Sequence, residues 1–210
     1  RLNKRRLREA EEDFLSRYPG GFEDPELSEI GNRHRMDHMV EMAGSCFTRR
    51  AFDHPGAIIE DMIRVVARSS MVSMFEKPKY RDHLHSLTGA EQGLLANSLK
   101  RQLYGKGSGR VKGFRTLVDI LRDGKLARWS LVTIIPNYVL PDDEVFLKPT
   151  TVKAVIKQFE LDLEYKPQPT WDFYSDYRNH ILSMRSQVNP ILAPSNAAFC
   201  GFLMMSLPGK

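Results

Sequence analysis

The chain has 210 residues, 41% of them hydrophobic, and its 31 basic and 26 acidic side chains leave a formal charge of +5. This length can bury a sizeable core, so the composition favours a folded protein over a disordered one. The longest apolar stretch, residues 197–205, is much shorter than the roughly 20 residues of a membrane-spanning helix, and we expect a cytoplasmic protein with no membrane partner.

The first half of the chain predicts helices with clear start signals. Asp24 precedes Pro25, and an N-cap acid before a proline at the first helical position is typical of a helix start. Residues 56–75 carry apolar side chains at three- and four-residue intervals, which predicts one long helix after Pro55. Thr88 and Glu91 have the spacing of a capping box, and the helix that they open should end at Gly105.

The second half mixes helical and strand-like patterns. Helices are expected over residues 114–122, from Thr150 or Thr151 to Phe159, over 171–188 and over 196–206. Residues 129–147 and 161–166 are instead β-branched, aromatic or alternating, which favours short strands. We therefore expect a mainly α, single-domain helical fold over residues 1–210, with a minor β element around residues 131–166. The glycines of residues 105–113 could divide it into two lobes.

Basic residues are concentrated in residues 100–128. Nine cations and two acids give this segment a charge of +7, which leaves the rest of the chain at about −2. The cations surround a glycine-rich stretch that we predict to be a turn, where backbone N–H groups and two helix faces could meet an anion. Tyr104 and Phe114 flank this turn and could stack on unpaired bases. A solvated basic surface with a flexible loop is the plainer interpretation.

These patterns predict non-catalytic binding of nucleic acid or another polyanion, without a cofactor. The predicted binding residues are Lys100, Arg101, Tyr104, Lys106, Arg110, Lys112, Arg115 and Arg122.

A metal-dependent nuclease is an alternative. Pro141, Asp142 and Asp143 are followed by Glu164 and Lys166, the residue types and order of PD-(D/E)xK nucleases. In such an enzyme the acids would hold Mg²⁺ or Mn²⁺ and the lysine would help to activate water. The competing interpretation is a pair of acids in a turn and a charged surface strand.

Histidine and cysteine give weaker signals. His34, His38 and Glu41 could share one helical face at metal-ligand spacing, but an exposed polar face is the preferred interpretation. Cys46 and Cys200 are too few for a disulfide framework and have apolar neighbours, so we expect both to pack as small hydrophobic residues in a reducing compartment.

One resemblance covers the C-terminal third of the chain. The residues 146–153 (FLKPTTVK) and the pattern Leu163-x-Tyr165-x-Pro167-x-Pro169-x-Trp171-x-x-Tyr174 resemble a segment of uncharacterised bacterial proteins. The resemblance implies a bacterial, intracellular protein and carries no activity. The helical spacing of the aromatic residues from Trp171 onward favours core packing over a ligand box.

A further alternative to nucleic-acid binding is a protein-interaction module with an acidic partner.

Overall fold

The computed structural model describes residues 1–209, and their regular structure is entirely helical. The α-helices are α1 (Lys4–Arg17), α2 (Pro25–Arg33), α3 (Met36–Cys46), α4 (Pro55–Arg68), α5 (Glu76–Ser86), α6 (Gly89–Tyr104), α7 (Gly107–Asp123), α8 (Trp129–Val139), α9 (Pro149–Gln158), α10 (Trp171–Arg185) and α11 (Asn196–Met205). Three short 3-10 helices are η1 (Gly21–Glu23), η2 (Arg49–Asp53) and η3 (Pro190–Leu192). The prediction of a mainly α fold is confirmed.

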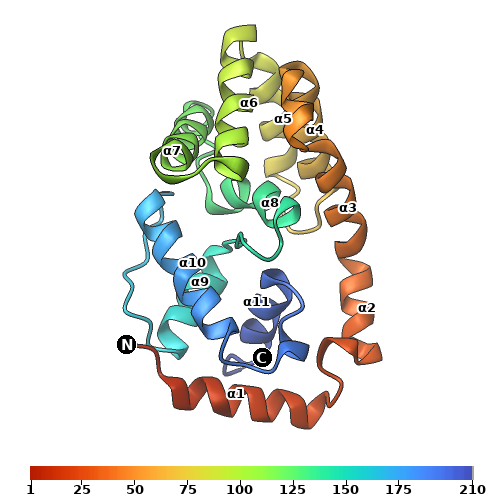
Figure 1. Cartoon of the computed structure of the whole chain (residues 1–210), viewed down its shortest axis with the longest axis vertical. Helices are drawn as coiled ribbons and strands as arrows, with labels where there is room; N and C mark the ends of the chain where they lie inside the picture. The colour runs from red at the N-terminus through yellow and green to blue at the C-terminus, as the bar shows by residue number, and fades with distance from the viewer. Residues whose placement is uncertain (210) are drawn as a thin grey trace.

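The helices are arranged along an elongated body, with α8 near its centre (Figure 1). Helix α1 lies across one end, α2 and α3 follow one side, and α4 to α7 form the opposite end. Helices α9, α10 and α11 lie between α1 and α8. Every α-helix contributes buried apolar side chains to one hydrophobic cluster, which therefore connects the two ends of the body. No helix in residues 1–209 has the length and apolar character needed to cross a membrane.

Helix α1 is attached to parts of the chain that are distant in sequence. The Asn3 side chain caps α1 by accepting from the backbone amide of Arg6. The backbone amide of Asn3 donates to the Phe159 carbonyl at 2.8 Å. The ring of Phe14 meets the edge of Phe202 at a centroid distance of 5.1 Å. The start of the chain is thus packed on the segments around α9 and α11.

The predicted minor β element is wrong, because no residue of 1–209 forms a strand. Residues 129–139 form α8, in which every side chain from 131 to 138 is buried. A helix that is buried on all sides has a continuous apolar sequence, and its periodicity cannot be distinguished from that of a buried strand. Residues 161–166 run as an irregular connection, so their alternating pattern has no partner strand.

Pro136 lies inside α8 and removes one backbone donor from the helix. The carbonyl left without its helical donor belongs to Val132, four residues earlier. The side-chain amide of Gln102, in α6, donates to this carbonyl at 3.3 Å. A buried side chain of α6 therefore replaces the missing backbone hydrogen bond and joins the two helices.

The predicted glycine-rich turn is also shorter than expected. Helix α7 begins at Gly107, so only Gly105 and Lys106 separate it from α6, and residues 107–113 are helical. Gly107 adopts a φ of 54°, a left-handed conformation that glycine reaches without strain. A Cβ on Gly113 would lie 2.6 Å from the Cβ of Arg101, which shows that α6 and α7 pack closely here.

Three predicted helix starts are confirmed, whereas α7 begins at Gly107 instead of residue 114, and α9 begins at Pro149 with Lys148, not Thr150 or Thr151, as its N-cap. Asp24 caps α2, Thr170 caps α10, and Thr88 and Glu91 form a complete capping box on α6. The long helix expected over residues 56–75 ends at Arg68 instead. The hydroxyl of Ser69 accepts from the Met71 amide at 3.1 Å, and such local bonds compete with helical ones.

Candidate nucleic-acid interface

Helices α6 and α7 position the predicted basic residues. Six of the nine cations of residues 100–128 have no ion-pair partner within the described part of the chain, and we call them the unpaired cations. They are Lys100, Arg101, Lys106, Lys112, Arg115 and Lys125. Five are exposed and Arg101 is half-buried. The side chains of residues 100–128 thus present surplus positive charge to the solvent.

The other three cations are paired. Arg122 contacts Asp119 at 2.7 Å on the exposed surface of α7, and Arg128 lies 3.9 Å from Glu76. Arg110 pairs with Glu144, whose side chain is almost completely buried. Arg110 was predicted to bind an anionic ligand, but its guanidinium already has an internal anion.

One exposed row on α7 carries several of the charges. Lys112, Arg115, Asp119 and Arg122 follow each other at intervals of three or four residues, so they lie along the same helical face. All four side chains are exposed. The row has two unpaired cations at one end and the Asp119–Arg122 pair at the other.

The two aromatic residues that flank the predicted turn both make contacts within the protein. Phe114 is completely buried, in contact with the rings of Trp171 and Tyr174. The Tyr104 hydroxyl donates to the Phe47 carbonyl at 2.5 Å, and the Arg49 guanidinium covers its ring at 4.8 Å. The prediction that Phe114 stacks on a base is therefore wrong, because its ring belongs to the core.

A hollow lies beside the exposed row, between α7 and the start of α10. Its volume is about 320 Å³, and it is open to solvent. We call it the α7–α10 hollow; it is lined by Phe114, Arg115, Val118, Asp119, Arg122, Pro169, Thr170, Trp171 and Asp172. Trp171 is half-buried, and it is the aromatic residue that sequence reasoning missed because its spacing suggested the core.

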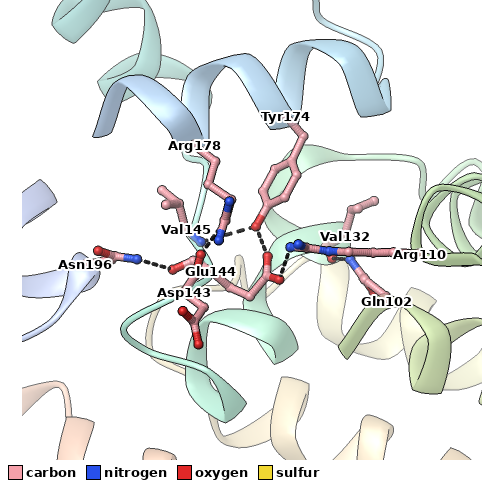
Figure 2. Close-up of polar contacts among 9 residues, drawn as sticks. All are labelled: Gln102, Arg110, Val132, Asp143, Glu144, Val145, Tyr174, Arg178 and Asn196. Carbon is pink, nitrogen blue, oxygen red and sulfur yellow. Dashed lines mark hydrogen bonds and ion pairs between the residues drawn. The ribbon is translucent and has the colours of Figure 1, made fainter. Parts of the chain in front are cut away.

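Beneath this surface, a buried polar network joins α7, α10 and α11 (Figure 2). The Glu144 carboxylate accepts from the Arg110 guanidinium and from the Tyr174 hydroxyl. The Asn196 side-chain amide donates to the Glu144 carbonyl at 3.0 Å. The Val145 amide donates to the Tyr174 hydroxyl at 3.3 Å. Glu144 therefore connects three helices through its own side chain and backbone.

Burial and the neighbouring carboxylate of Glu144 together raise the pKa of Tyr174 well above its ordinary value. The phenol is consequently protonated at neutral pH and serves as a donor to Glu144. Hydrogen bonds between a charged acceptor and a buried donor are the stronger kind. Nothing in the sequence distinguishes Glu144 from the two acids directly before it, Asp142 and Asp143. In the structure these two side chains are exposed, whereas that of Glu144 is buried.

The residues of the nuclease pattern have separate partners. Asp142 contacts Arg185 at 2.9 Å, and Glu164 contacts Lys166 at 3.5 Å on the surface. The Asp143 side chain is exposed, while its carbonyl accepts from Arg178. Within residues 1–209 no three His, Cys, Asp or Glu side chains are grouped as a metal site would require. The nuclease pattern thus has the residue types without the strands or the grouped ligands.

The predicted histidine face is interrupted. Helix α2 ends at Arg33 and α3 begins at Met36, with Arg35 in a left-handed conformation at φ 51°. His34 lies at this break, 2.9 Å from the Ser70 hydroxyl, whereas His38 and Glu41 belong to α3. The three side chains therefore do not share one continuous helix, as their spacing predicted.

The cysteines differ in their surroundings. The guanidinium of Arg64 donates to the Cys46 sulfur at 3.0 Å, and this bond raises the pKa of Arg64. Burial raises the pKa of the Cys200 thiol to about 12, so this thiol is neutral at physiological pH. For Cys200 this fits the expected role of a small packing residue.

Comparisons of the chain with protein-family models, with curated proteins and with solved structures give no match.

Proposed function

We propose that the protein binds nucleic acid, or another polyanion, through the unpaired cations of α6 and α7. The observation that carries this proposal is that six of nine closely spaced cations have no acidic partner in residues 1–209. A cation without a partner loses no ion pair when it meets a phosphate, and the counterion condensed on that phosphate is released. Binding of this kind needs no catalytic group and no cofactor.

Salt dependence tests the proposal directly. Labelled single-stranded DNA, single-stranded RNA and duplex DNA are titrated in a polarisation assay at about 50 mM and about 200 mM salt. Four to six phosphate contacts give a log–log slope of about −3 to −5. If none of the three ligands binds at the lower salt concentration, the proposal is wrong.

A matched pair of double variants locates the surface. Replacing Lys112 and Arg115 by glutamine should weaken binding and make the salt slope shallower by about two, one for each contact. The control replaces Lys148 and Lys157, which are exposed on or beside α9 and have no ion-pair partner in the described chain. Both variants lose two charges, so an equal loss of affinity would indicate a general charge effect instead of a defined surface.

A protein-interaction module is a second candidate, favoured by one specific observation. Met74 and Phe75 are adjacent and have exposed fractions of 76% and 83%. Lys79 and Arg128 lie close enough to Glu76 to lower its pKa, against the larger raising effect of burial. An apolar pair beside cations suits an acidic partner with an apolar pocket.

Photo-crosslinking tests this second candidate. A photoreactive amino acid at position 75 should capture a discrete acidic protein in cells, and Lys77→Glu with Lys79→Glu should abolish the capture. Capture that is unaffected by these charge reversals would contradict an acidic partner.

A further inference from the structure

The α7–α10 hollow combines an aromatic ring with balanced charge. Arg115 and Arg122 bring two positive charges to its lining, and Asp119 and Asp172 bring two negative ones. The half-buried Trp171 provides the aromatic surface. The volume is at the lower end of the range for clefts that hold small ligands.

The lining does not suit a phosphate group. A phosphate in the hollow would meet Asp119 and Asp172 as well as the two arginines, so repulsion would offset much of the attraction. A nucleobase is different, because it is uncharged, has a flat π-face and carries both donors and acceptors on its edge. Carboxylates and guanidinium groups can both bind such an edge.

Trp171 is held in place from several sides. Its ring meets Phe114 at a centroid distance of 5.5 Å with the planes at 71°, and it lies 5.9 Å from Tyr174. The Arg110 guanidinium lies over one face of the ring, 5.2 Å from its centroid, so a base would stack on the opposite face. Because Arg110 is itself paired with the buried Glu144, the network of Figure 2 holds in place the guanidinium that lies over the indole. A ring that is already ordered loses little side-chain entropy when a base stacks on it.

From this arrangement we propose that the α7–α10 hollow receives an unpaired base of single-stranded nucleic acid, stacked on Trp171. The inference rests on the proposed function and specifies its ligand. The unpaired cations Lys112 and Arg115, on the same face of α7, contact the phosphates that flank the base. A base in a duplex is stacked and paired, so it cannot enter the hollow without being unpaired first. Single strands therefore bind more tightly than duplexes of equal length.

The first experiment separates bases from phosphates on the unmodified protein. A single-stranded oligonucleotide and an abasic oligonucleotide of the same length carry the same backbone charge. Stacking of one base contributes about five- to a hundredfold in affinity, so the abasic ligand should bind at least about fivefold more weakly. Equal affinities would overturn the stacking inference and leave the proposed function intact.

The second experiment uses variants of the indole. Trp171→Leu keeps an apolar side chain but removes the π-face, and it should weaken binding of the base-containing strand about tenfold. Binding of the abasic strand should be unchanged, and Trp171→Phe should restore part of the difference. Thermal unfolding of each variant shows whether it has folded. If the leucine variant folds and binds the base-containing strand normally, the assignment of Trp171 is wrong.

Tryptophan fluorescence gives an independent measurement. The other tryptophan, Trp129, is buried, so quenching by a stacked base should come from Trp171 alone. The single-stranded ligand should quench the emission of the unmodified protein, and Trp171→Phe should remove this quenching. Binding without quenching would overturn the stacking inference. A failure of all oligonucleotides to bind at low salt would instead overturn the proposed function, and the stacking inference with it.

Discussion

Arg110 and Arg115 lie on the same helix, five residues apart, and their guanidinium groups have opposite environments. Arg110 contacts a carboxylate whose side chain is only 2% exposed, and Arg115 faces solvent at the rim of a hollow. Both residues contribute equally to the basic composition of the segment. The comparison shows that a count of cations overestimates the charge available to a ligand, because the helical face decides which cations hold the protein together.

Removing the internal anion is the most severe way to challenge this comparison. Glu144→Ala leaves the Arg110 charge and the Tyr174 hydroxyl in the interior without their acceptor. The loss of one partner of a buried ion pair destabilises a protein by about 3–5 kcal/mol. Urea unfolding monitored by circular dichroism measures this loss. As a control, Glu144→Leu combined with Arg110→Met should recover much of it, and a loss below about 1 kcal/mol in the single variant would show that the pair is not structural.

Two glycines of α7 provide the next test. Gly113→Ala places a Cβ 2.7 Å from the Ser98 carbonyl oxygen, so the backbones of α6 and α7 must separate, at a loss of about 1–3 kcal/mol. Gly109→Ala is the matched control, because nothing lies within 4 Å of its added Cβ. This control should be neutral or stabilising by up to about 1 kcal/mol. If the two substitutions changed the free energy of unfolding equally, the close approach of α6 and α7 at Gly113 would be contradicted.

Protonation extends the contrast between buried and exposed groups. Since burial raises the pKa of the Cys200 thiol from 9.0 to about 12, the folded chain retains a proton that the unfolded chain releases above pH 9. The unfolded state then binds fewer protons, so stability falls as the pH rises from about 9 towards 12. The slope from this thiol approaches about 1.4 kcal/mol per pH unit. Urea unfolding between pH 8 and pH 10 should show a shallower decline for Cys200→Ala than for the unmodified chain, and identical slopes would contradict this origin.

The smallest effect on stability is expected at the surface. Replacing Lys112 and Arg115 by glutamine removes exposed charges that have no ion-pair partner in residues 1–209. Such changes usually alter the free energy of unfolding by less than about 0.5 kcal/mol. Thermal unfolding of this double variant should therefore match the unmodified protein while its affinity for nucleic acid falls. A large loss of stability would instead show that Lys112 and Arg115 stabilise the fold, as Arg110 does.

Local signals in the sequence predicted several of the helix starts. Thr88 and Asp24 cap helices through their own side chains, and this chemistry is complete within three residues of chain. Residues 129–139 were mistaken for strands because α8 is buried on every side, which removes the polar face that would reveal a helical period. Glycines at 107, 109 and 113 suggested a turn, but Gly113 serves a close helix crossing that depends on α6.

The candidate site was predictable only in part. The excess of cations in residues 100–128 is a property of composition and could be read directly. The pairing of Arg110 with Glu144 joins residues 34 positions apart and follows from the packing of α7 on the loop before α9. The position of Trp171 beside Arg115 likewise depends on how α10 approaches α7. No local pattern encodes such contacts between distant segments.

The attachment of α1 to the Phe159 carbonyl and to the Phe202 ring has a consequence for the time course of folding during synthesis. Phe159 follows Asn3 by 156 residues and Phe202 follows Phe14 by 188, so at 5–20 residues per second these partners are made about 8 to 40 seconds later. During this interval Phe14, which is buried in the finished protein, can contact the nearby rings of Tyr18 and Phe22 but not that of Phe202. Helix α1 can therefore make these contacts only after the segments around Phe159 and Phe202 have been synthesised.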